Sequence, residues 1–477
     1  MLKTNYCTNL NKQFAGKKVK LAGWVSSRRD HGKIIFIDLR DRTGIVQLVI
    51  SPENKVLYEI ADKLRGEFVI AVEGTVNLRP TGMQNKKIAT GEVEVVVEAL
   101  SILAKSKTLP FEINKDTKTI DEEKRMEFRY LDLRSERMKK NLLIRHKAVK
   151  FIRDYMDEKG FLEVETPILS KSTPEGARDF VAPSRLHPGK FYALPQSPQQ
   201  YKQLLMAGGL EKYFQIARCL RDEDPRADRQ AEHTQLDLEM SFIENKEEIM
   251  AILEELIIKL VEYLEPLTGK KLLQKPLPRL TWAEAMAKYQ TDKPDLRKNQ
   301  EPNTLAFAWV VEWPQFEWNK DEKRWDPMHH MFVLPEKGYE KYLDSNPEKV
   351  ISTQFDLVCN GYEICSGSLR INTRQLQEKI FKLIRLGVKK GQEQFGHLLE
   401  SFDRGCPPHG GVAPGIDRLV MLLAGEDNIR EVIAFPKTGD GRDLMMAAPS
   451  EVSPEQLREL KIEVVKKRIP KKKPSKN

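Results

Sequence analysis

The most informative stretch of the sequence is FQIARCLRDEDPRADRQAEHTQLDLEMSF, residues Phe214–Phe242. Both of its ends are strand-like and a densely charged loop separates them, so we expect a hairpin. Five polar side chains lie at the inner ends of this hairpin: Arg221, Glu223, Gln235, Asp237 and Glu239. A surface loop with salt bridges is the ordinary interpretation of such a run. Beside a sheet, however, these charges cost free energy unless a charged ligand is bound, so the hairpin predicts a binding site.

Two further segments lie on either side of the hairpin in the sequence. GFLEVETPILSKSTPEGARDF (Gly160–Phe180) precedes it, and the Gly-rich GGVAPGIDRLVMLLAG (Gly410–Gly425) follows it. In this order the three segments resemble motifs 1, 2 and 3 of the class II aminoacyl-tRNA synthetases, in the aspartate subgroup of bacterial type. The resemblance covers nearly the whole chain. It implies a multidomain protein whose α+β catalytic domain has an antiparallel sheet backed by helices.

The resemblance implies that the enzyme activates L-aspartate with ATP and transfers it to the 3′ end of tRNA. The first step is an in-line attack of a carboxylate on the α-phosphate, and because two anions meet, fixed cations are needed. By resemblance, Arg221 binds both anions, Arg418 holds the far end of the bent triphosphate, and Glu363 completes the catalytic set. The implied ATP-binding residues are Arg221, Asp222, Glu223, Gln230, His233, Glu363, Gly415, Ile416, Asp417 and Arg418. His233 stands where the family usually has an aromatic residue that stacks on adenine.

A second predicted hairpin, residues 355–364, carries Asp356 and Glu363. Magnesium prefers oxygen ligands, often one or two carboxylates together with the triphosphate. Two acids on a hairpin are weak evidence for a metal by themselves. The resemblance implies that both bind Mg²⁺.

Substrate choice depends on two cations. By resemblance, Arg370 and Lys202 bind the side-chain carboxylate of aspartate, whereas asparagine and lysine offer no such group. The implied aspartate-binding residues are Glu175, Ser197, Gln199, Lys202, Arg221, Gln235, Asp237, His329, His330 and Arg370. The adjacent His329 and His330 suggest a metal site, but on a strand they would face opposite ways. Their family counterpart is a mobile loop that closes over the substrate.

The first hundred residues predict an OB barrel. Five short runs rich in β-branched residues are separated by Gly-containing turns: Val19–Ser26, Ile34–Arg40, Ile45–Ile50, Val69–Leu78 and Val93–Leu103. A helix is expected at about residues 53–64, between the third and fourth runs. OB barrels commonly bind single-stranded nucleic acid. Alternation places Phe36, Asp38 and Arg40 on one face, where Phe36 is either a base-stacking platform or an ordinary surface aromatic.

Specificity for tRNA is expected to lie in this barrel. Residues that match anticodon-contacting positions of relatives, or their specificity positions, are Arg29, His31, Phe36, Gln47, Gly82 and Glu92. His31 and Gly82 are of the types found in relaxed-specificity bacterial enzymes, which charge both tRNA(Asp) and tRNA(Asn) and rely on a tRNA-dependent amidotransferase partner. The alternative is that these two residues mark only turns, in an enzyme strictly specific for tRNA(Asp).

The chain divides into an anticodon-binding domain (1–105), a linker (106–137), a catalytic domain (138–465) and a basic tail (466–477). Helices are expected over 136–159, ended by Gly160, and over 246–264, 374–388 and about 393–403. Bacterial relatives usually carry a domain-sized insertion between the segments that match Trp282 and Trp309, and this chain has only a short polar loop. Other departures are Cys365 and Ser366 in place of a glycine pair, and Pro414 in place of Phe.

Bulk properties agree with this interpretation. The net charge is +9, which suits a polyanionic partner, although the tail KKRIPKKKPSKN supplies part of it and is explained as well by a solvated end. No membrane span or secretory signal is expected. The five scattered cysteines favour a reducing, cytoplasmic compartment. Motif 1, with Gly160 and Pro167, implies a homodimer.

Two other classes of function remain open from the sequence. A non-catalytic tRNA-binding paralogue would be expected to lose Arg221, Glu363 or Arg418, which are all present. A tRNA-independent ligase that makes a small amide would be expected to lack the barrel.

Overall fold

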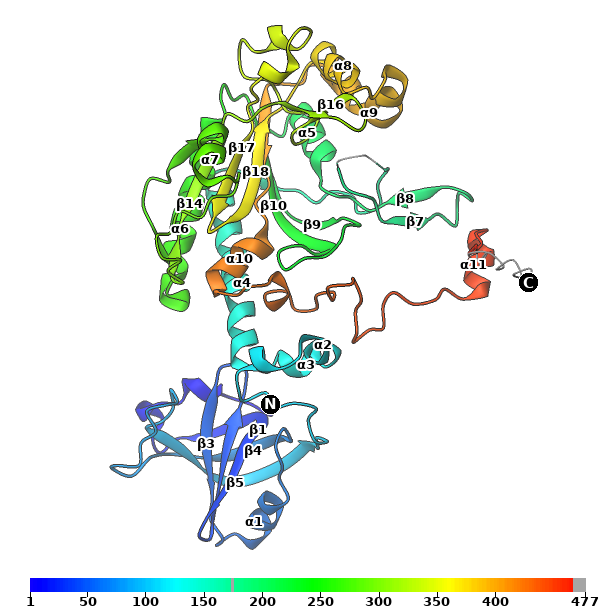
Figure 1. The fold of residues 1–477 in the computed structure, drawn as a ribbon. Helices are drawn as coiled ribbons and strands as arrows, with labels where there is room; N and C mark the ends of the chain where they lie inside the picture. Colours follow the sequence, from blue (N-terminus) through cyan, green and yellow to red (C-terminus); the bar gives the residue numbers. More distant parts are fainter. Residues whose placement is uncertain (173–175, 466–477) are drawn as a thin grey trace, which may run out of the picture. The chain divides into compact units, whose positions relative to one another are not determined.

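The computed structural model describes residues 1–172 and 176–465. By its contacts the chain forms two compact units, Met1–Lys139 and Lys140–Asn477 (Figure 1). The finer division expected from the sequence, with its boundaries at residues 105, 137 and 465, stays a prediction.

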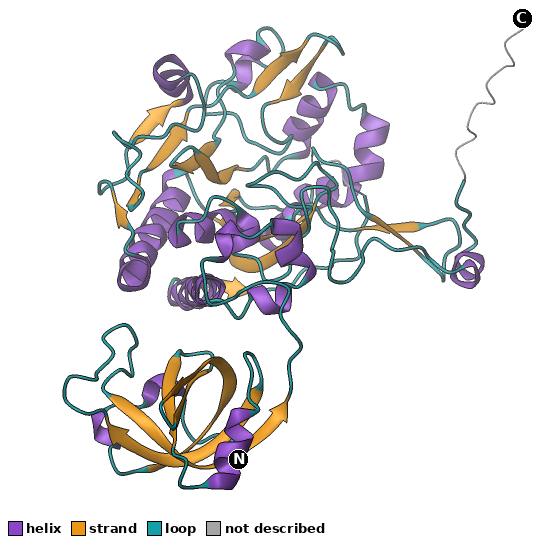
Figure 2. Cartoon of the chain, turned by 60° about the horizontal axis from the view of Figure 1, so that its bottom comes forward, coloured by secondary structure: helices purple, strands orange, loops and turns teal. Residues whose placement is uncertain are grey.

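The first unit contains a closed barrel of five strands in the order β1-β2-β3-β5-β4, and Figure 2 shows how they curve around one another. Its elements are β1 (Lys18–His31), β2 (Ile34–Arg40), β3 (Ile45–Ile50), α1 (Lys55–Asp62), β4 (Val69–Leu78) and β5 (Val93–Ala104). Neighbouring strands are antiparallel except β3 and β5, which are parallel. The OB barrel and the position of its helix are confirmed.

Alternation in β2 determines which side chains fill the barrel. Ile35, Ile37 and Leu39 are fully buried, whereas Phe36 and Asp38 are only half-buried. Arg40 shares their strand parity but is itself buried, because its guanidinium donates to the Glu67 carboxylate at 2.7 Å. It therefore stabilises the barrel and is not available to a ligand.

The segment expected to be an irregular linker contains short helices: η3 (Thr117–Thr119), α2 (Glu122–Glu127) and α3 (Arg129–Asp132). Their anchor is polar. The buried Asp132 carboxylate accepts from Arg129 at 2.6 Å and from Arg125 at 3.2 Å. Because a buried ion-pair cluster leaves no apolar periodicity in the sequence, the pattern missed these helices.

The second unit is built on an eight-stranded sheet in the order β12-β14-β17-β18-β19-β10-β9-β6. These strands are β12 (Arg279–Thr281), β14 (Phe307–Val311), β17 (Phe355–Cys359), β18 (Tyr362–Leu369), β19 (His409–Val412), β10 (Glu232–Ser241), β9 (Lys212–Leu220) and β6 (Leu162–Glu163). The central six are antiparallel, as expected. The outer pairs β12–β14 and β6–β9 are parallel, so the sheet as a whole is mixed.

Three helices share one core with the sheet: α4 (Glu136–Glu158), α6 (Glu247–Thr268) and α10 (Ile416–Ala424). The expected stripe of α6 is buried throughout: Ile249, Leu253, Leu256, Leu260 and Leu264. Helix α4 ends before Gly160, whose φ of +76° is the left-handed conformation that glycine adopts without strain.

The predicted helix boundaries in the C-terminal half need correction. Helix α8 (Arg374–Leu383) is shorter than the expected 374–388, and α9 (Val388–Phe402) begins earlier than expected. The break covers residues 384–387, in which Arg385 and Gly387 both have positive φ, +57° and +79°. The remaining elements that bear on the site are β7 (Val181–Pro183), β8 (Phe191–Ala193), α5 (Gln199–Ala207), α7 (Trp282–Tyr289), β13 (Thr304–Leu305), β15 (Phe316–Asn319) and β16 (Arg324–Pro327).

Two further expectations concern the cysteines and membrane-spanning helices. All five cysteines are buried and none forms a disulfide. Within the part of the chain that the structure describes, no helix combines the length and apolar character that a membrane crossing requires.

Candidate active site

Two adjoining cavities lie at the sheet, between the motif 2 hairpin and the β17–β18 hairpin. The larger has a volume of about 600 Å³ and the smaller of about 90 Å³. Four residues line both: Arg221, Gln235, Glu363 and Ala413. A ligand that extends through both cavities would therefore pass Arg221.

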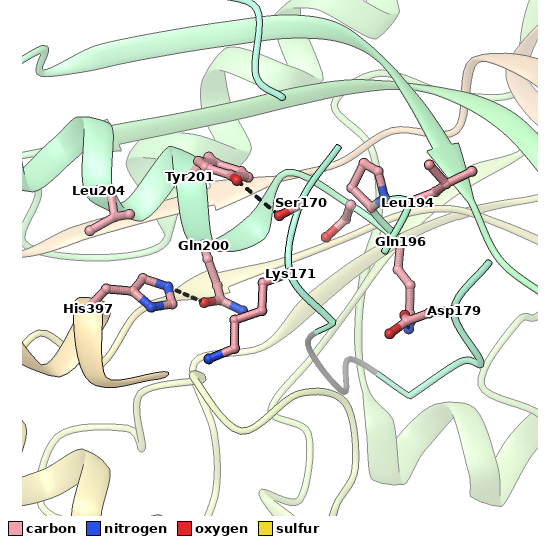
Figure 3. A pocket seen from close by; sticks show the side chains of 11 residues that line it. Ser170, Lys171, Asp179, Leu194, Gln196, Gln200, Tyr201, Leu204 and His397 are labelled. Atoms are coloured by element: carbon pink, nitrogen blue, oxygen red, sulfur yellow. Dashed lines mark hydrogen bonds between the residues drawn. The ribbon is translucent and has the colours of Figure 1, made fainter. Parts of the chain in front are cut away.

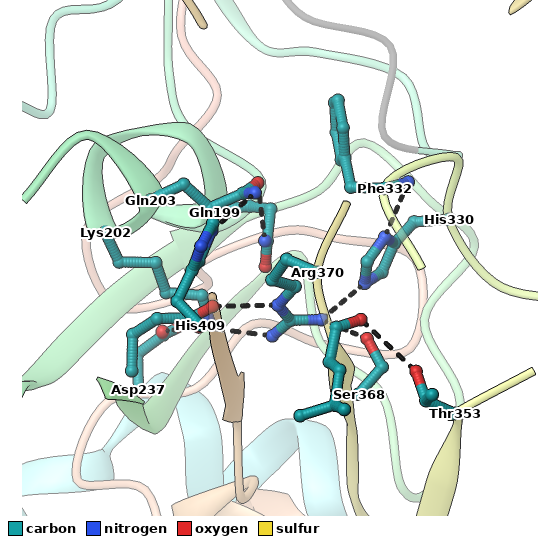
Figure 4. A network of polar contacts seen from close by, with 12 residues as sticks. Gln199, Lys202, Gln203, Asp237, His330, Phe332, Thr353, Ser368, Arg370 and His409 are labelled. Atoms are coloured by element: carbon teal, nitrogen blue, oxygen red, sulfur yellow. Dashed lines mark hydrogen bonds and ion pairs between the residues drawn. The ribbon is translucent and has the colours of Figure 1, made fainter. Parts of the chain in front are cut away.

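Arg370 lies at the end of β18 and is the centre of a buried polar network in the larger cavity (Figure 4). Its Nε and Nη2 donate to the two oxygens of Glu239 at 2.9 and 3.2 Å. Its Nη1 donates to Ser368 Oγ at 2.6 Å and lies 2.9 Å from His330 Nε2. Burial and the neighbouring guanidinium lower the pKa of His330 well below its ordinary value, which keeps the ring neutral.

Lys202, on α5, is the second cation of this network. Its Nζ lies 2.6 Å from Asp237 Oδ1 and 3.2 Å from Glu239 Oε2, and all three side chains are buried. Burial would raise the pKa of Glu239, but Arg370 and Lys202 hold it below its ordinary range. Gly411 keeps this position open, because a Cβ there would lie 2.0 Å from the Glu239 carboxylate.

Asp237 differs from Glu239 in the hydrogen-bonding capacity that its carboxylate leaves for a ligand. Apart from the Lys202 ion pair, neither of its oxygens has a hydrogen-bond partner among the residues that the structure describes. Burial raises the pKa of Asp237, so its charge is poorly compensated. Such a carboxylate fits an incoming ammonium group, while the donors of Arg370 and Lys202 fit a carboxylate. The larger cavity is thus suited to a small amino acid with an acidic side chain.

The smaller cavity is rich in arginine and suits a polyphosphate. Arg221, Arg229 and Arg418 line it together with three acids, Glu223, Asp228 and Glu363. Arg229 pairs with Glu223 at 3.1 Å, and Arg418 pairs with Asp228 at 3.1 Å. Planar guanidinium groups bind phosphate oxygens through two parallel hydrogen bonds.

His233 lines the same cavity and remains neutral near pH 7. Burial and the nearby Arg221 and Arg418 lower its pKa to about 3. A neutral ring surrounded by cations can stack on a base without adding positive charge to the cavity.

Asp356 and Glu363 lie on β17 and β18, and their surroundings fit a divalent cation. Burial raises the pKa of Asp356 to about 6, and repulsion from Glu363 contributes to this rise. The buried Gln354 Oε1 and His329 Nε2 nearby have no hydrogen-bond partner among the described residues. The described chain contains no cluster of three or more His, Cys, Asp or Glu arranged to hold a metal. Two carboxylates alone fit Mg²⁺ that takes its other ligands from a bound triphosphate.

Comparison with known proteins agrees with this geometry. Residues 121–439 match the family described as tRNA synthetases class II (D, K and N), and residues 19–103 match the OB-fold nucleic acid binding domain. The chain belongs to the class II tRNA synthetases.

Curated relatives extend over nearly the whole chain of this synthetase. A protein of Rubrobacter xylanophilus named aspartate–tRNA(Asp/Asn) ligase is 42% identical, with 96% of each chain covered. A protein of Thermotoga neapolitana with the same name is 41% identical over 97% of this chain and 100% of its own. The first alignment spans 584 positions, more than the 477 residues here, so that relative has residues without a counterpart in this chain.

Solved structures share the fold. The asparaginyl-tRNA synthetase of Pyrococcus horikoshii in complex with asparaginyl-adenylate superposes with a TM-score of 0.73 at 24% identity, covering 92% of this chain and 99% of its own. The aspartyl-tRNA synthetase of Entamoeba histolytica gives a TM-score of 0.72 at 22% identity, covering 91% of each chain.

Most of the residues expected to bind substrates line the two cavities of the synthetase, and their roles stay predictions. Among the described ones, three do not line either cavity. Asp222 is half-exposed, and its backbone N–H donates to Arg178 O at 3.0 Å. Ile416 and Asp417 are buried, and the Asp417 carboxylate accepts from Thr234 N at 2.8 Å, which ties α10 to β10. Glu175 lies outside the described residues.

His329 and His330 lie in the loop after β16 and not on a strand, contrary to the premise of the sequence argument. They still face different partners. His330 contacts Arg370, whereas His329 packs its ring edge-on against Trp313, with the centroids 4.7 Å apart. Both line the larger cavity.

The departures from the family pattern are accommodated. Ser366, in place of glycine, donates to Asp356 Oδ1 at 2.6 Å, and Cys365 is buried. The Pro414 carbonyl accepts from Leu236 N at 2.8 Å, which joins it to β10.

Several residues that shape the site have no substrate role among the predictions from the sequence. Glu239 orients Arg370. In the same network, Gln203 Nε2 lies 3.1 Å from His409 Nε2. Lys293 Nζ lies 3.1 Å from Glu363 Oε2. The Glu239 charge was visible in the motif 2 strand. Lys293 and His409 come from distant segments, and nothing local in the sequence marks them.

A third cavity, of about 350 Å³, adjoins the larger one at Ser197, which lines both. Figure 3 shows side chains that line this third cavity, among them Gln200, Tyr201 and His397. His397 Nε2 lies 2.6 Å from Gln200 Oε1, and the hydroxyls of Tyr201 and Ser170 are 2.9 Å apart. The buried Gln200 Nε2 has no hydrogen-bond partner among the described residues. With Lys171 on its wall, the cavity offers donors to an anionic or polar ligand.

The barrel carries the residues expected to read the anticodon, and their roles stay predictions. Arg29 Nη2 donates to Asp38 at 2.9 Å, and Gln47 Nε2 donates to Glu94 at 3.1 Å. Glu92 precedes β5 and pairs with Lys12 at 2.8 Å. The two acids are one strand period apart, and only Glu94 lies within β5.

His31 and Gly82 both occupy exposed positions in the barrel unit. His31 is the last residue of β1, beside the β1–β2 turn, and Gly82 has φ +86° with open space around it.

Proposed function

We propose that this chain is an aspartate–tRNA ligase that charges both tRNA(Asp) and tRNA(Asn). The observation that carries the proposal is the larger cavity, in which Arg370 and Lys202 offer cationic donors and Asp237 an under-compensated carboxylate. Only an amino acid with an ammonium group and an acidic side chain satisfies all three. The names of the curated relatives support the same substrate and both tRNAs.

In the first step, Asp237 binds the aspartate ammonium group, and Arg370 with Lys202 bind its side-chain carboxylate. The α-carboxylate then faces Arg221, which lines both cavities and also reaches the α-phosphate of ATP. Arg221 reduces the repulsion between the two anions as the pentacovalent arrangement forms. No protein nucleophile is needed, because positioning and charge supply the catalysis.

The remaining groups of the smaller cavity bind ATP. Arg418 holds the β- and γ-phosphates, and His233 stacks on the adenine. Asp356 and Glu363 hold Mg²⁺, which when bound neutralises charge on the triphosphate.

The third cavity suits the 3′-terminal nucleotide of the tRNA. Because it meets the aspartate cavity at Ser197, a nucleotide bound there lies next to the activated carboxyl group. The unpartnered Gln200 amide and Lys171 serve as donors to it.

Relaxed tRNA choice is supported by His31 and Gly82 together with the Asp/Asn names of the relatives. Aspartate esterified to tRNA(Asn) must be amidated before use in translation, so a tRNA-dependent amidotransferase is the expected partner. A cytoplasmic location follows from this activity.

We also propose a homodimer formed through the motif 1 region. Apolar side chains between β6 and β8 are exposed in the single chain to an unusual degree: Leu162, Ile168, Leu169, Val181, Leu186, Phe191 and Tyr192. Exposed apolar side chains gathered along one segment are typical of an oligomer interface.

Phe36→Ala in the barrel should separate the two steps of the reaction. Loss of a stacking platform costs about 1–3 kcal/mol per base, so kcat/KM for tRNA(Asp) should fall by roughly 5- to 150-fold. ATP–pyrophosphate exchange without tRNA should be unchanged, because Phe36 lies in the other unit from the cavities. Tyr6→Ala, which removes an exposed aromatic from the same unit, is the control. Equal losses in tRNA charging and in ATP–pyrophosphate exchange would contradict the assignment of tRNA binding to the barrel and of aspartate activation to the second unit.

A further inference from the structure

Lys293 lies in the loop between α7 and β13, outside the three motifs and outside the residues assigned to any substrate. Its Nζ is 3.1 Å from Oε2 of Glu363, and Arg418 Nη1 is 4.0 Å from the other oxygen of that carboxylate. Glu363 is thus held by cations on both sides. Burial would raise the pKa of Glu363, but Lys293 and Arg418 hold it below its ordinary range.

The loop fixes the backbone beneath Lys293. Leu296 packs against the apolar cluster between α7 and the sheet, which includes Ala308 and Val358. Arg297 donates to the Asp295 carboxylate through Nε at 3.0 Å and through Nη2 at 2.6 Å. It also donates to Glu301 O at 3.3 Å. The cation is therefore presented to Glu363 by a folded loop and not by a freely moving segment.

A lysine at this place has an electrostatic consequence for the metal. The proposed function assigns Glu363 to Mg²⁺, yet one oxygen of this carboxylate is already occupied by an ammonium group. A divalent cation that approaches the free enzyme must displace Lys293 and is repelled by it. When the triphosphate is present, its negative charges offset this repulsion and offer Lys293 another partner.

We propose that Lys293 is a positioning residue that makes metal binding depend on ATP. In the free enzyme it occupies Glu363 and lowers the affinity for the divalent cation. With nucleotide bound it leaves the carboxylate to the metal and turns toward the polyphosphate. The proposal rests on the proposed function, because it needs Asp356 and Glu363 to be the metal ligands.

Mn²⁺ binding to the full chain, followed by electron paramagnetic resonance, tests this directly. The free wild-type enzyme is expected to bind Mn²⁺ weakly, and Lys293→Met should bind it about three- to tenfold more tightly, since a partly exposed ion pair is removed. With a non-hydrolysable ATP analogue bound, the difference should disappear or reverse. Lys293→Arg, which keeps the cation, should resemble the wild type without nucleotide.

Lys298→Met provides the matched control, because it removes an exposed charge from the same loop. If Lys293→Met leaves Mn²⁺ affinity of the free enzyme unchanged or weakens it, the proposal is overturned. If the wild type binds no Mn²⁺ even with the analogue, the metal assignment in the proposed function fails, and the inference fails with it. Normal analogue-dependent Mn²⁺ binding combined with an unchanged Lys293→Met would reject the inference alone.

Discussion

Arg370→Leu should lower kcat/KM for aspartate in ATP–pyrophosphate exchange by about two to four orders of magnitude. Removing one partner of a buried charge pair typically costs about 3–5 kcal/mol, and each 1.4 kcal/mol is a factor of ten. In this enzyme the substrate carboxylate would lose its planar donor, and the buried Glu239 would lose both of its guanidinium hydrogen bonds. The loss should appear in KM for aspartate and in kcat, while KM for ATP changes little.

The same substitution is expected to destabilise the fold, because Glu239 is completely buried and would keep only Lys202, at 3.2 Å. Arg370→Lys addresses this difficulty. It keeps the charge but not the planar fork, so it should fold better and still lose much of the aspartate activation. Arg374→Leu is the control, since Arg374 pairs with Asp403 at 2.6 Å, away from the cavities. Near-normal exchange by a folded Arg370→Leu would refute the assignment.

Arg221→Gln should lower kcat of exchange by about two to three orders of magnitude, with smaller changes in either KM. Arg221 lines both cavities, so its charge is needed most where the two anions approach each other in the transition state. Loss of one such electrostatic contact commonly costs about 3–4 kcal/mol of transition-state stabilisation.

Arg218→Gln is the matched control for this variant. It lies three residues earlier on β9 and pairs with Glu232 at 2.6 Å, without lining either cavity. Exchange rates that fall equally in the two variants would indicate a general effect of charge on the hairpin. A rise in KM for ATP with unchanged kcat would show that Arg221 binds ATP but does not act on the reacting groups.

Local patterns predicted much of this architecture. The alternation of Ile35, Ile37 and Leu39 identified the inner face of the barrel, and the spacing from Ile249 to Leu264 identified the buried side of α6. Both patterns consist of apolar residues at regular spacing, so they can be recognised in the sequence alone. The helices around Asp132 were missed because part of their anchor is a buried cluster of charges. The end of α8 was misplaced because the chain leaves the helix before Arg385, with φ +57°, although the helical pattern of the sequence continues.

The site could be predicted only in part. The motif residues Arg221, Arg370 and Arg418 were identified by resemblance, and the structure brings them to adjoining cavities. Contacts between distant segments were not predictable, because Lys293 meets Glu363 only through the folded loop. The contact of Gln47 with Glu94 was likewise not predictable, because only the folded barrel brings β3 and β5 together.

Parallel aminoacylation of purified tRNA(Asp) and tRNA(Asn) transcripts with labelled aspartate tests the central claim most directly. We predict that both are charged, with kcat/KM values of the same order. Charging of tRNA(Asp) alone would contradict relaxed specificity and the interpretation of His31 and Gly82, and charging of neither would contradict the proposed enzyme.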